Sequence, residues 1–457
     1  MSSVVSSRSA GSRGSLRSAA AAAGDLDADG RQLLAAYLAP VTEPDLAGVD
    51  PAALAATVAV HLALGRTRTA GEHRLQLLTS GGSAVVAGGA TLLLVTDDRP
   101  FLVDTVTMEL TRQGWSLRRL YHPQLRVERG PSGGLADLAR GPEGLPESWI
   151  AIEAGPPLGE AADALAGPLL AGLGQALDAL AAVVEDWQPM VARARAAAAE
   201  LRDADPAGTT EAVALLDWLA SGNFVFLGCA DHTLTDGRLT PVPGSGLGIL
   251  AGATDPDDVT VPAQGERDPL VLVRDPHRSP VHRPVYLEHV AARRYDPEGR
   301  LVVEHRFLGL LAASAYTDSV ANIPVLAAKT DRLLATSGFE PHSHGWNAVR
   351  QVVATYPRDE LFEATVDELA PIVASVAALR ERRQARVFLR RARYGRFATA
   401  LVYLPRDRYN TATRLRIQQV LLDRLGGVEL EFTTLVSESV LTRLFFVLRL
   451  GPDAPAD

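Results

Sequence analysis

The sequence predicts an α+β protein of several domains, with ferredoxin-like modules separated by helical segments. Residues 76–187 read as strand, helix, strand, strand, helix, which is the core of a ferredoxin-like βαββαβ fold. Residues 384–451 again read as strands around one helix, so a duplicated module is suggested, although the strand order differs between the two. The 457 residues also exceed one core, since a domain usually takes ~100–200 residues.

The N-terminal region is predicted to be a tail followed by helices. Residues 1–24 hold three arginines, many serines and no acidic residue, a composition typical of a disordered tail and shared with organelle transit peptides. We favour the disordered tail and place it outside the fold. Residues 25–75 have helical patterns, and Asp50 is expected to cap the helix that begins at Pro51.

The first module is predicted over 76–187. A strand, TLLLVT (91–96), precedes a helix over 100–113, whose apolar stripe consists of Leu102, Val103, Val106 and Leu110. Further strands are expected at 117–127 and 148–154, and a long Ala/Leu-rich helix at 159–187.

The remaining segments alternate between helical and β-rich patterns. Gly338 is expected just after the end of one helix, and Gly426–Gly427 after another. The predicted segments are a helical linker (188–222), a β-rich second module (223–320), a helical segment (321–383), a third module (384–451) and a short tail (452–457).

Composition excludes several functional classes. The net charge of −9 argues against nucleic-acid binding, and no apolar run is predicted to span a membrane. A single cysteine, Cys229, excludes an intramolecular disulfide framework, so we expect a reducing, cytoplasmic setting. Lys329 is the only lysine, which leaves one candidate at most for Schiff-base or amine chemistry.

Catalytic, cofactor and metal motifs are missing from the sequence. The nearest approach to a dinucleotide fingerprint, GSGLG (244–248), leads into no helix and is interpreted as a turn. His277 and His282 lie in a proline-rich stretch that cannot present both on one helix face, and the other histidines are interpreted as surface or turn residues. We therefore predict no catalytic, cofactor-binding or metal-binding residue in this chain.

Two kinds of corner are candidate sites. In DDRPFLVDTVTMEL (97–110) a strand meets a helix, where unpaired N–H groups suit an anion or effector, and its candidate residues are Asp98, Arg99, Phe101, Asp104 and Met108. Pro-Arg-Asp occurs twice, with Arg358 and Asp359, and with Arg406 and Asp407. We interpret these residues as structural Arg–Asp pairs or caps; the alternative is a clamp on an effector carboxylate.

Several ordered blocks resemble the N-terminal region of the large bacterial NAD-dependent glutamate dehydrogenases. They include RPFLVDTVTMEL, HRPVYLEHVAARRYDPEGRLVVEHRFLGLLAASAY, SGFEPHSHGWNAVRQVVATYPRDELF and FATALVYLPRDRYNT, spread over 85–450. The resemblance implies that the three modules are ACT-like sensor domains, and that a catalytic domain lies further along the family's chain. It also implies that the full-length protein would oxidise L-glutamate with NAD, in amino-acid catabolism.

The resemblance and the residues agree on what this chain lacks. With one lysine and no dinucleotide fingerprint, it should bind no NAD and transfer no hydride alone. We expect a regulatory and oligomerisation region whose partners are the remainder of the dehydrogenase, or a separately encoded catalytic part, and other copies of itself. The alternative is a stand-alone amino-acid sensor or protein-interaction module without enzymatic activity.

Phe101 favours one of the two uses of the first corner. ACT domains that bind amino acids usually have glycine after the proline of this corner, whereas here the residue is Phe101. On a helical wheel Phe101 and Met108 lie away from the predicted core stripe. We therefore favour a packing interface over an effector site at this corner.

Overall fold

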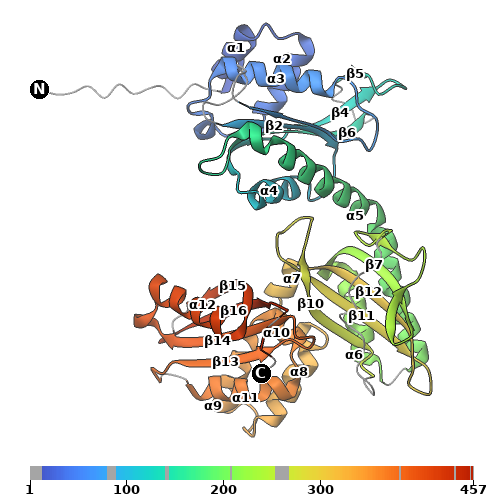
Figure 1. Cartoon of the computed structure of the whole chain (residues 1–457), viewed down its shortest axis with the longest axis vertical. Helices are drawn as coiled ribbons and strands as arrows, with labels where there is room; N and C mark the ends of the chain where they lie inside the picture. Colours follow the sequence, from blue (N-terminus) through green and yellow to red (C-terminus); the bar gives the residue numbers. More distant parts are fainter. Residues whose placement is uncertain are drawn as a thin grey trace, which may run out of the picture. The chain divides into compact units, whose positions relative to one another are not determined.

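The computed structural model (Figure 1) describes residues 13–79, 89–138, 144–205, 208–252, 267–379, 382–436, 439–452 and 454–455. The chain divides into two compact units. Unit 1 consists of residues 1–184 together with the short segment 280–284, and unit 2 of residues 185–279 and 285–457. Each unit is described by itself.

Unit 1 begins with three helices, and the first of them corrects a prediction. Residues 13–23, which we expected in a disordered tail, form helix α1 (Arg13–Ala23). The alanine run favours helix, and Leu16 and Ala20, one turn apart, are buried in a cluster with α2 (Ala28–Leu38) and α3 (Pro51–Gly65). Residues 1–12 of the predicted tail lie outside the described part. Asp50 caps α3 as predicted, accepting from Ala52 N at 3.1 Å.

The sheet of unit 1 is antiparallel. Its edge strand β1 (Arg74–Leu78) pairs with β2 (Ala90–Asp97), which pairs with β6 (Leu145–Gly155). The strand predicted at 117–127 is instead two strands, β3 (Ser116–Tyr121) and β4 (Gln124–Arg129), both paired with β6. His122–Pro123 separates them, because proline has no N–H to give to a ladder. Helix α4 (Leu102–Arg112) joins β2 to β3, and β5 (Leu135–Asp137) pairs antiparallel with β4.

Both faces of this sheet are covered. Leu93, Val95 and Trp149 belong to one cluster with α1–α3. The alternating residues Leu92 and Leu94 point the other way and are fully buried as well. On that second side Figure 1 shows α4 and the first half of α5 (Ala162–Ala204). Unit 1 is therefore a sheet between two helical layers.

Helix α5 contributes its first half to unit 1 and its second half to unit 2. It is the one helix in the described part of the chain that is long and apolar enough to cross a membrane by length and composition alone. Its apolar residues also supply protein core, since Met190, Ala194 and Leu201 lie in the main cluster of unit 2.

Unit 2 continues with a second antiparallel sheet. Its elements are α6 (Thr210–Trp218), a π-helical turn (Leu219–Asn223), β7 (Phe224–Thr235), β8 (Arg238–Pro241), β9 (Leu247–Gly248), β10 (Leu270–Arg278), β11 (Tyr286–Tyr295) and β12 (Leu301–Leu311). The strand order is β10-β11-β12-β7-β8, with β9 paired to β7. Strands β10, β11 and β12 follow one another directly, so no helix crosses between them in the described residues.

A helical segment and a third sheet complete unit 2. The helices are α7 (Ala313–Thr317), a 3-10 turn (Val320–Asn322), α8 (Leu326–Thr336), α9 (His344–Thr355), α10 (Arg358–Glu363) and α11 (Val366–Leu379). Gly338 follows α8 with φ 71°, as predicted for its end. The third sheet contains β13 (Arg386–Arg391), β14 (Phe397–Pro405), a 3-10 turn (Arg406–Arg408), α12 (Thr411–Leu425), β15 (Gly427–Leu435) and β16 (Leu441–Leu450).

The first and third sheets have the same topology, which corrects the predicted difference in strand order. In the third sheet the order is β13-β14-β16-β15, with α12 joining β14 to β15. In the first, β1-β2-β6 is followed by β3 and β4, with α4 joining β2 to β3. The prediction missed β1, the edge strand of the first copy. If β3 and β4 are counted as one interrupted strand and the short β5 is left aside, both copies are strand–strand–helix–strand–strand, with the edge strand at the start of the module.

Candidate functional site: the strand-to-helix corner of unit 1

The corner lies where β2 ends at Asp97 and α4 begins at Leu102. The buried strand β2 fixes its position, and Asp98 N donates to Pro146 O at 3.1 Å, which ties the turn to the start of β6. The prediction of a strand-to-helix corner is confirmed. Its chemistry depends on what the carboxylates at this point contact.

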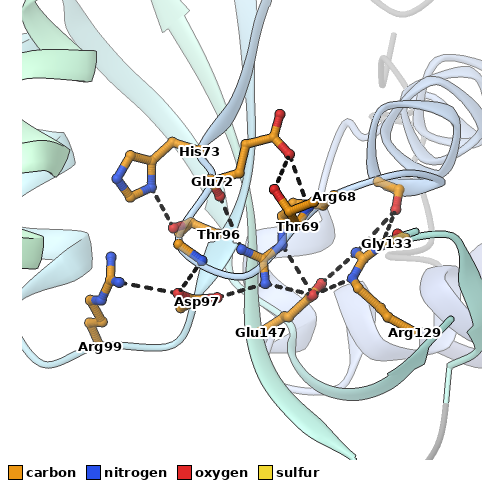
Figure 2. Close-up of polar contacts among 12 residues, drawn as sticks. Arg68, Thr69, Glu72, His73, Thr96, Asp97, Arg99, Arg129, Gly133 and Glu147 are labelled. Atoms are coloured by element: carbon orange, nitrogen blue, oxygen red, sulfur yellow. Dashed lines mark hydrogen bonds and ion pairs between the residues drawn. The ribbon is translucent and has the colours of Figure 1, made fainter. Parts of the chain in front are cut away.

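Asp97 is held from three directions (Figure 2). One carboxylate oxygen accepts from Arg68 at 2.7 Å, and the other accepts from Gly71 N at 3.0 Å and from Arg99 at 3.1 Å. The Arg68 side chain is only 1% exposed. Asp97 therefore neutralises a buried arginine and links it to the backbone of Gly71 and to Arg99.

Glu147, directly opposite Asp97 on β6, forms the base of this network. One oxygen accepts from Arg68 Nη2 at 2.7 Å and from Arg129 Nε at 2.5 Å; the other accepts from Arg129 Nη2 at 2.8 Å and Trp149 Nε1 at 3.0 Å. Burial alone would raise the pKa of Glu147, but the hydrogen bonds and charges of Arg129 and Arg68 outweigh it and hold the pKa below its usual value. Glu147 is thus a buried anion between two cations.

Asp98 is also bonded within the fold. Its carboxylate accepts from Ser148 Oγ at 2.6 Å and from Gln124 at 3.2 Å. His122 Nε2 lies 2.9 Å from the same Ser148 hydroxyl, and burial lowers the pKa of His122. The carboxylates of Asp97, Asp98 and Glu147 are therefore all bonded within the protein, and their main effect is to fix the turn.

Phe101 adopts the backbone conformation that glycine would have at this point. Its φ of 62° and ψ of 8° are left-handed, and its side chain makes no cap to α4. The ring lies against His282 of segment 280–284, with centroids 4.4 Å apart. His282 Nδ1 is also 2.8 Å from Asp104, and His282 N donates to Thr105 Oγ1 at 3.1 Å. Segment 280–284 thus packs on the start of α4 within unit 1.

The other predicted residues of this corner divide between surface and interior. Met108, which the helical wheel placed away from the core stripe, is only 8% exposed in this chain. Val103 of the predicted stripe is half-buried, whereas Leu102, Val106 and Leu110 are buried as expected. Part of the helix face offered to a partner is thus already covered within unit 1. The use of the corner as an interface or effector site stays a prediction.

The second Pro-Arg-Asp sequence occupies the equivalent corner of the third sheet. Arg406 N donates to Val440 O at 2.9 Å, the counterpart of the bond from Asp98 to Pro146. Asp407 pairs with Arg383 at 3.5 Å, with both side chains exposed. Asn410, not an aspartate of the corner, caps α12 by accepting from Thr413 N at 2.9 Å.

The first Pro-Arg-Asp sequence begins α10 and reaches into a buried ionic cluster. Arg358 donates to the carbonyl of Asp318 at 3.1 Å, whereas Asp359 pairs with Arg274 at 3.0 Å. The next residue, Glu360, accepts two bonds from Arg390, both 2.9 Å.

Sequence reasoning missed the arginine partners in this cluster. Arg274 and Arg390 come from strands β10 and β13, tens of residues from the carboxylates they contact. The sequence signals are the arginine that ends the apolar run LVLVR and the arginines on both sides of the apolar run in RVFLRR.

The single lysine is structural. Lys329 Nζ donates to the carbonyls of Leu361, Phe362 and Ala364 at 2.7–2.8 Å, which holds the end of α10. Burial lowers its pKa to about 8. It lines a cavity of about 930 Å³ beside β10, whose rim arginine Arg332 is already paired with Glu211 at 2.7 Å. All three amine donors are engaged, which disfavours an amine nucleophile here.

The histidines are dispersed among structural contacts. His305 lies 2.8 Å from Asp231 and 3.1 Å from Glu200, and its pKa is lowered mainly by burial. Within the described ranges, no group of three or more His, Cys, Asp or Glu side chains is arranged to hold a metal ion.

Fold and site together define the class of protein. It is an α+β region in which a sheet-and-helix module occurs twice, with helical segments between the two copies. The carboxylates at its candidate sites are bonded to other groups of the same chain. Comparison with known families gives the particular one. Residues 33–166 match the glutamate dehydrogenase ACT1 domain, 323–382 its helical motif 1, and 386–457 its ACT2 domain. The chain belongs to the family of large NAD-specific glutamate dehydrogenases and corresponds to their ACT-domain region.

Individual relatives agree. The chain is 37% identical over 382 residues to the NAD-specific glutamate dehydrogenase of Pseudomonas aeruginosa, covering 79% of this chain and 23% of that protein. Identity is 34% over 389 residues to the enzyme of Halomonas elongata (79% and 24%) and 32% over 414 residues to that of Mycobacterium tuberculosis (86% and 24%). The chain therefore spans about a quarter of the length of these relatives. The three matched domains leave the predicted ACT-like module at 223–320 untested.

Proposed function

We propose that this chain is the regulatory and assembly region of an NAD-dependent glutamate dehydrogenase. The observation that supports this most directly is the succession of ACT1, helical motif and ACT2 matches along the chain. The whole enzyme would convert L-glutamate and NAD to 2-oxoglutarate, ammonia and NADH, in the cytoplasm. NAD would bind to the catalytic part and not to these residues.

The geometry of the first corner disfavours effector capture. Asp97 and Asp98, the carboxylates nearest the start of α4, are both engaged by groups of unit 1. Phe101 occupies the left-handed position where a glycine would leave the backbone accessible. With effector capture disfavoured at this corner, the chain would act through contacts that other parts of its surface make with the remainder of the dehydrogenase and with other copies of itself.

Activity and assembly measurements test the proposal. Purified 1–457 should give no glutamate-dependent NADH formation at 340 nm and no heat on titration with NAD. When it is mixed with the part of the Pseudomonas aeruginosa relative that lies outside the matched region, sedimentation should show a larger complex. NADH formation by the chain alone would refute the assignment of catalysis elsewhere, and unchanged sedimentation of the mixture would refute the assembly role.

A further inference from the structure

The edge, second and last strands of the two copies of the module can be aligned residue by residue from their registers. In the first sheet Leu75 and Leu77 of the edge strand lie opposite Leu94 and Leu92. In the third sheet Val387 and Leu389 lie opposite Val402 and Ala400. Both sets point to the side of the sheet that carries the module's own helix, α4 or α12, because Val402 and Ala400 share a cluster with α12.

In unit 1 the edge-strand half of this side is covered by α5. His73, which adjoins β1, lies 3.6 Å from Asp178 of α5. Gly172 of α5 approaches α4 so closely that a Cβ there would lie 2.1 Å from Glu109, so the two helices are neighbours. Leu169, Leu173 and Leu177 of α5 are buried, and Leu75 and Leu77 beneath this side are half-buried.

In the third sheet the corresponding half, which carries β13, is exposed. Helix α12 lies mainly over β15, where the Arg414 guanidinium is 4.3 Å from the centre of the Phe432 ring. Leu421 of α12 belongs to the same apolar cluster as Leu444 and Phe446 of β16. Val387 and Leu389 are 53% and 54% exposed. On α12, Leu415 and Val420, which lie on opposite flanks of its buried stripe, are 53% and 45% exposed. No described residue after β16 forms a helix that could occupy this place as α5 does after β6.

We propose that an amphipathic helix packs beside α12 and covers Val387 and Leu389, as α5 packs beside α4 and covers Leu75 and Leu77. The inference rests on the proposed function, because the helix is assigned to the dehydrogenase polypeptide outside the matched region, about three quarters of the relatives' length. Its contact surface is an apolar stripe, since the sheet and α12 present aliphatic side chains. The fit is that of a helix on a sheet, which removes apolar area from water on both partners.

Cysteine labelling tests the proposal, because the native chain should react only slowly with thiol reagents. The only native cysteine, Cys229, is 1% exposed, and burial raises its pKa to about 11, so it reacts slowly with thiol reagents. Val387→Cys and Leu389→Cys each place a thiol on the exposed β13 half of the third sheet. Leu234→Cys, at a residue 40% exposed on β7, is the matched control.

Labelling rates are compared in 1–457 and in the same chain joined to the remainder of the Pseudomonas aeruginosa relative. We expect Val387→Cys and Leu389→Cys to react about tenfold or more slowly in the longer polypeptide, equivalent to ~1.4 kcal/mol of docking, with Leu234→Cys unchanged. Equal rates would overturn the proposal. Protection that grows with the concentration of 1–457 alone would also overturn it, by assigning the surface to a second copy.

A second measurement avoids dependence on the folding of the fusion. Val387→Cys in 1–457 carries an environment-sensitive fluorophore, and overlapping synthetic peptides from the relative's unmatched sequence are titrated against it. One helical peptide should bind, and its binding should be lost when its apolar stripe is changed to serine; failure of every peptide would overturn the proposal. Glutamate-dependent NADH formation is recorded separately, so a failure of the proposed function is distinguishable from a failure of helix docking.

Discussion

The buried anion Glu147 provides the sharpest test of how unit 1 is held together. Glu147→Gln keeps the shape of the side chain but removes its charge, while Arg68 and Arg129 remain 1% and 4% exposed. Arg68 keeps Asp97, but Arg129 loses its only carboxylate partner among the described contacts. The amide would also present N–H donors to guanidinium donors. Leaving a buried charge uncompensated typically costs ~3–5 kcal/mol.

A surface pair gives the matched control. Glu211 accepts two 2.7 Å bonds from Arg332, but both side chains are about half exposed, so Glu211→Gln should cost less than about 1 kcal/mol. Thermal melts followed by circular dichroism compare the variants, at ~2–4 °C per kcal/mol for a unit of this size. Hydrogen exchange of β6 localises the loss to unit 1. If Glu147→Gln melts no lower than Glu211→Gln, the account of Glu147 as a required buried anion is refuted.

Three further perturbations address α1, the corner backbone and pH. Leu16→Ser should destabilise unit 1 by roughly 1–3 kcal/mol in urea unfolding, whereas Ala19→Ser on the exposed side of α1 should not; equal effects would contradict the docking of α1. Phe101→Gly should be about 1 kcal/mol more stable than Phe101→Ala in the same assay, because both lose the ring but only glycine relieves the left-handed backbone; equal stabilities would argue against strain. Burial lowers the pKa of His61 to about 4, so the native state resists its protonation. Stability should therefore fall as pH drops from about 6.5 towards 4, by up to ~3 kcal/mol, and His61→Gln should flatten that dependence in melts across this range.

Local sequence patterns were enough to predict most elements of the fold. The apolar stripe of α4 and the strand β6 follow from periodicity within a few residues, and Asp50 and Gly338 mark helix ends through bonds to near neighbours. The error at α1 arose because composition alone was used: its alanine run favours helix, and burial of Leu16 by α2 and α3 stabilises it.

Long-range partners could not be predicted in the same way. The contact of Arg68 with Glu147 spans 79 residues, and that of Arg390 with Glu360 spans 30. From sequence alone an arginine is predicted to lie on the surface, because its buried partners are not visible until the pairing of the strands is known. The same limit hid β1, whose five residues alternate weakly but pair fully with β2, and with it the identity of topology between the two sheets.

The two copies of the module differ in the residues at one matching pair of core positions. By strand register, Asp97 and Glu147 of the first copy correspond to Pro405 and Leu441 of the third sheet. One module thus has an ionic interior at the place where the other has apolar residues. Segments of the two copies are consequently not interchangeable: grafting β16 in place of β6 would leave Arg68 and Arg129 facing a leucine. Protein engineers who recombine these modules should exchange a whole sheet together with its arginines, and never a single strand.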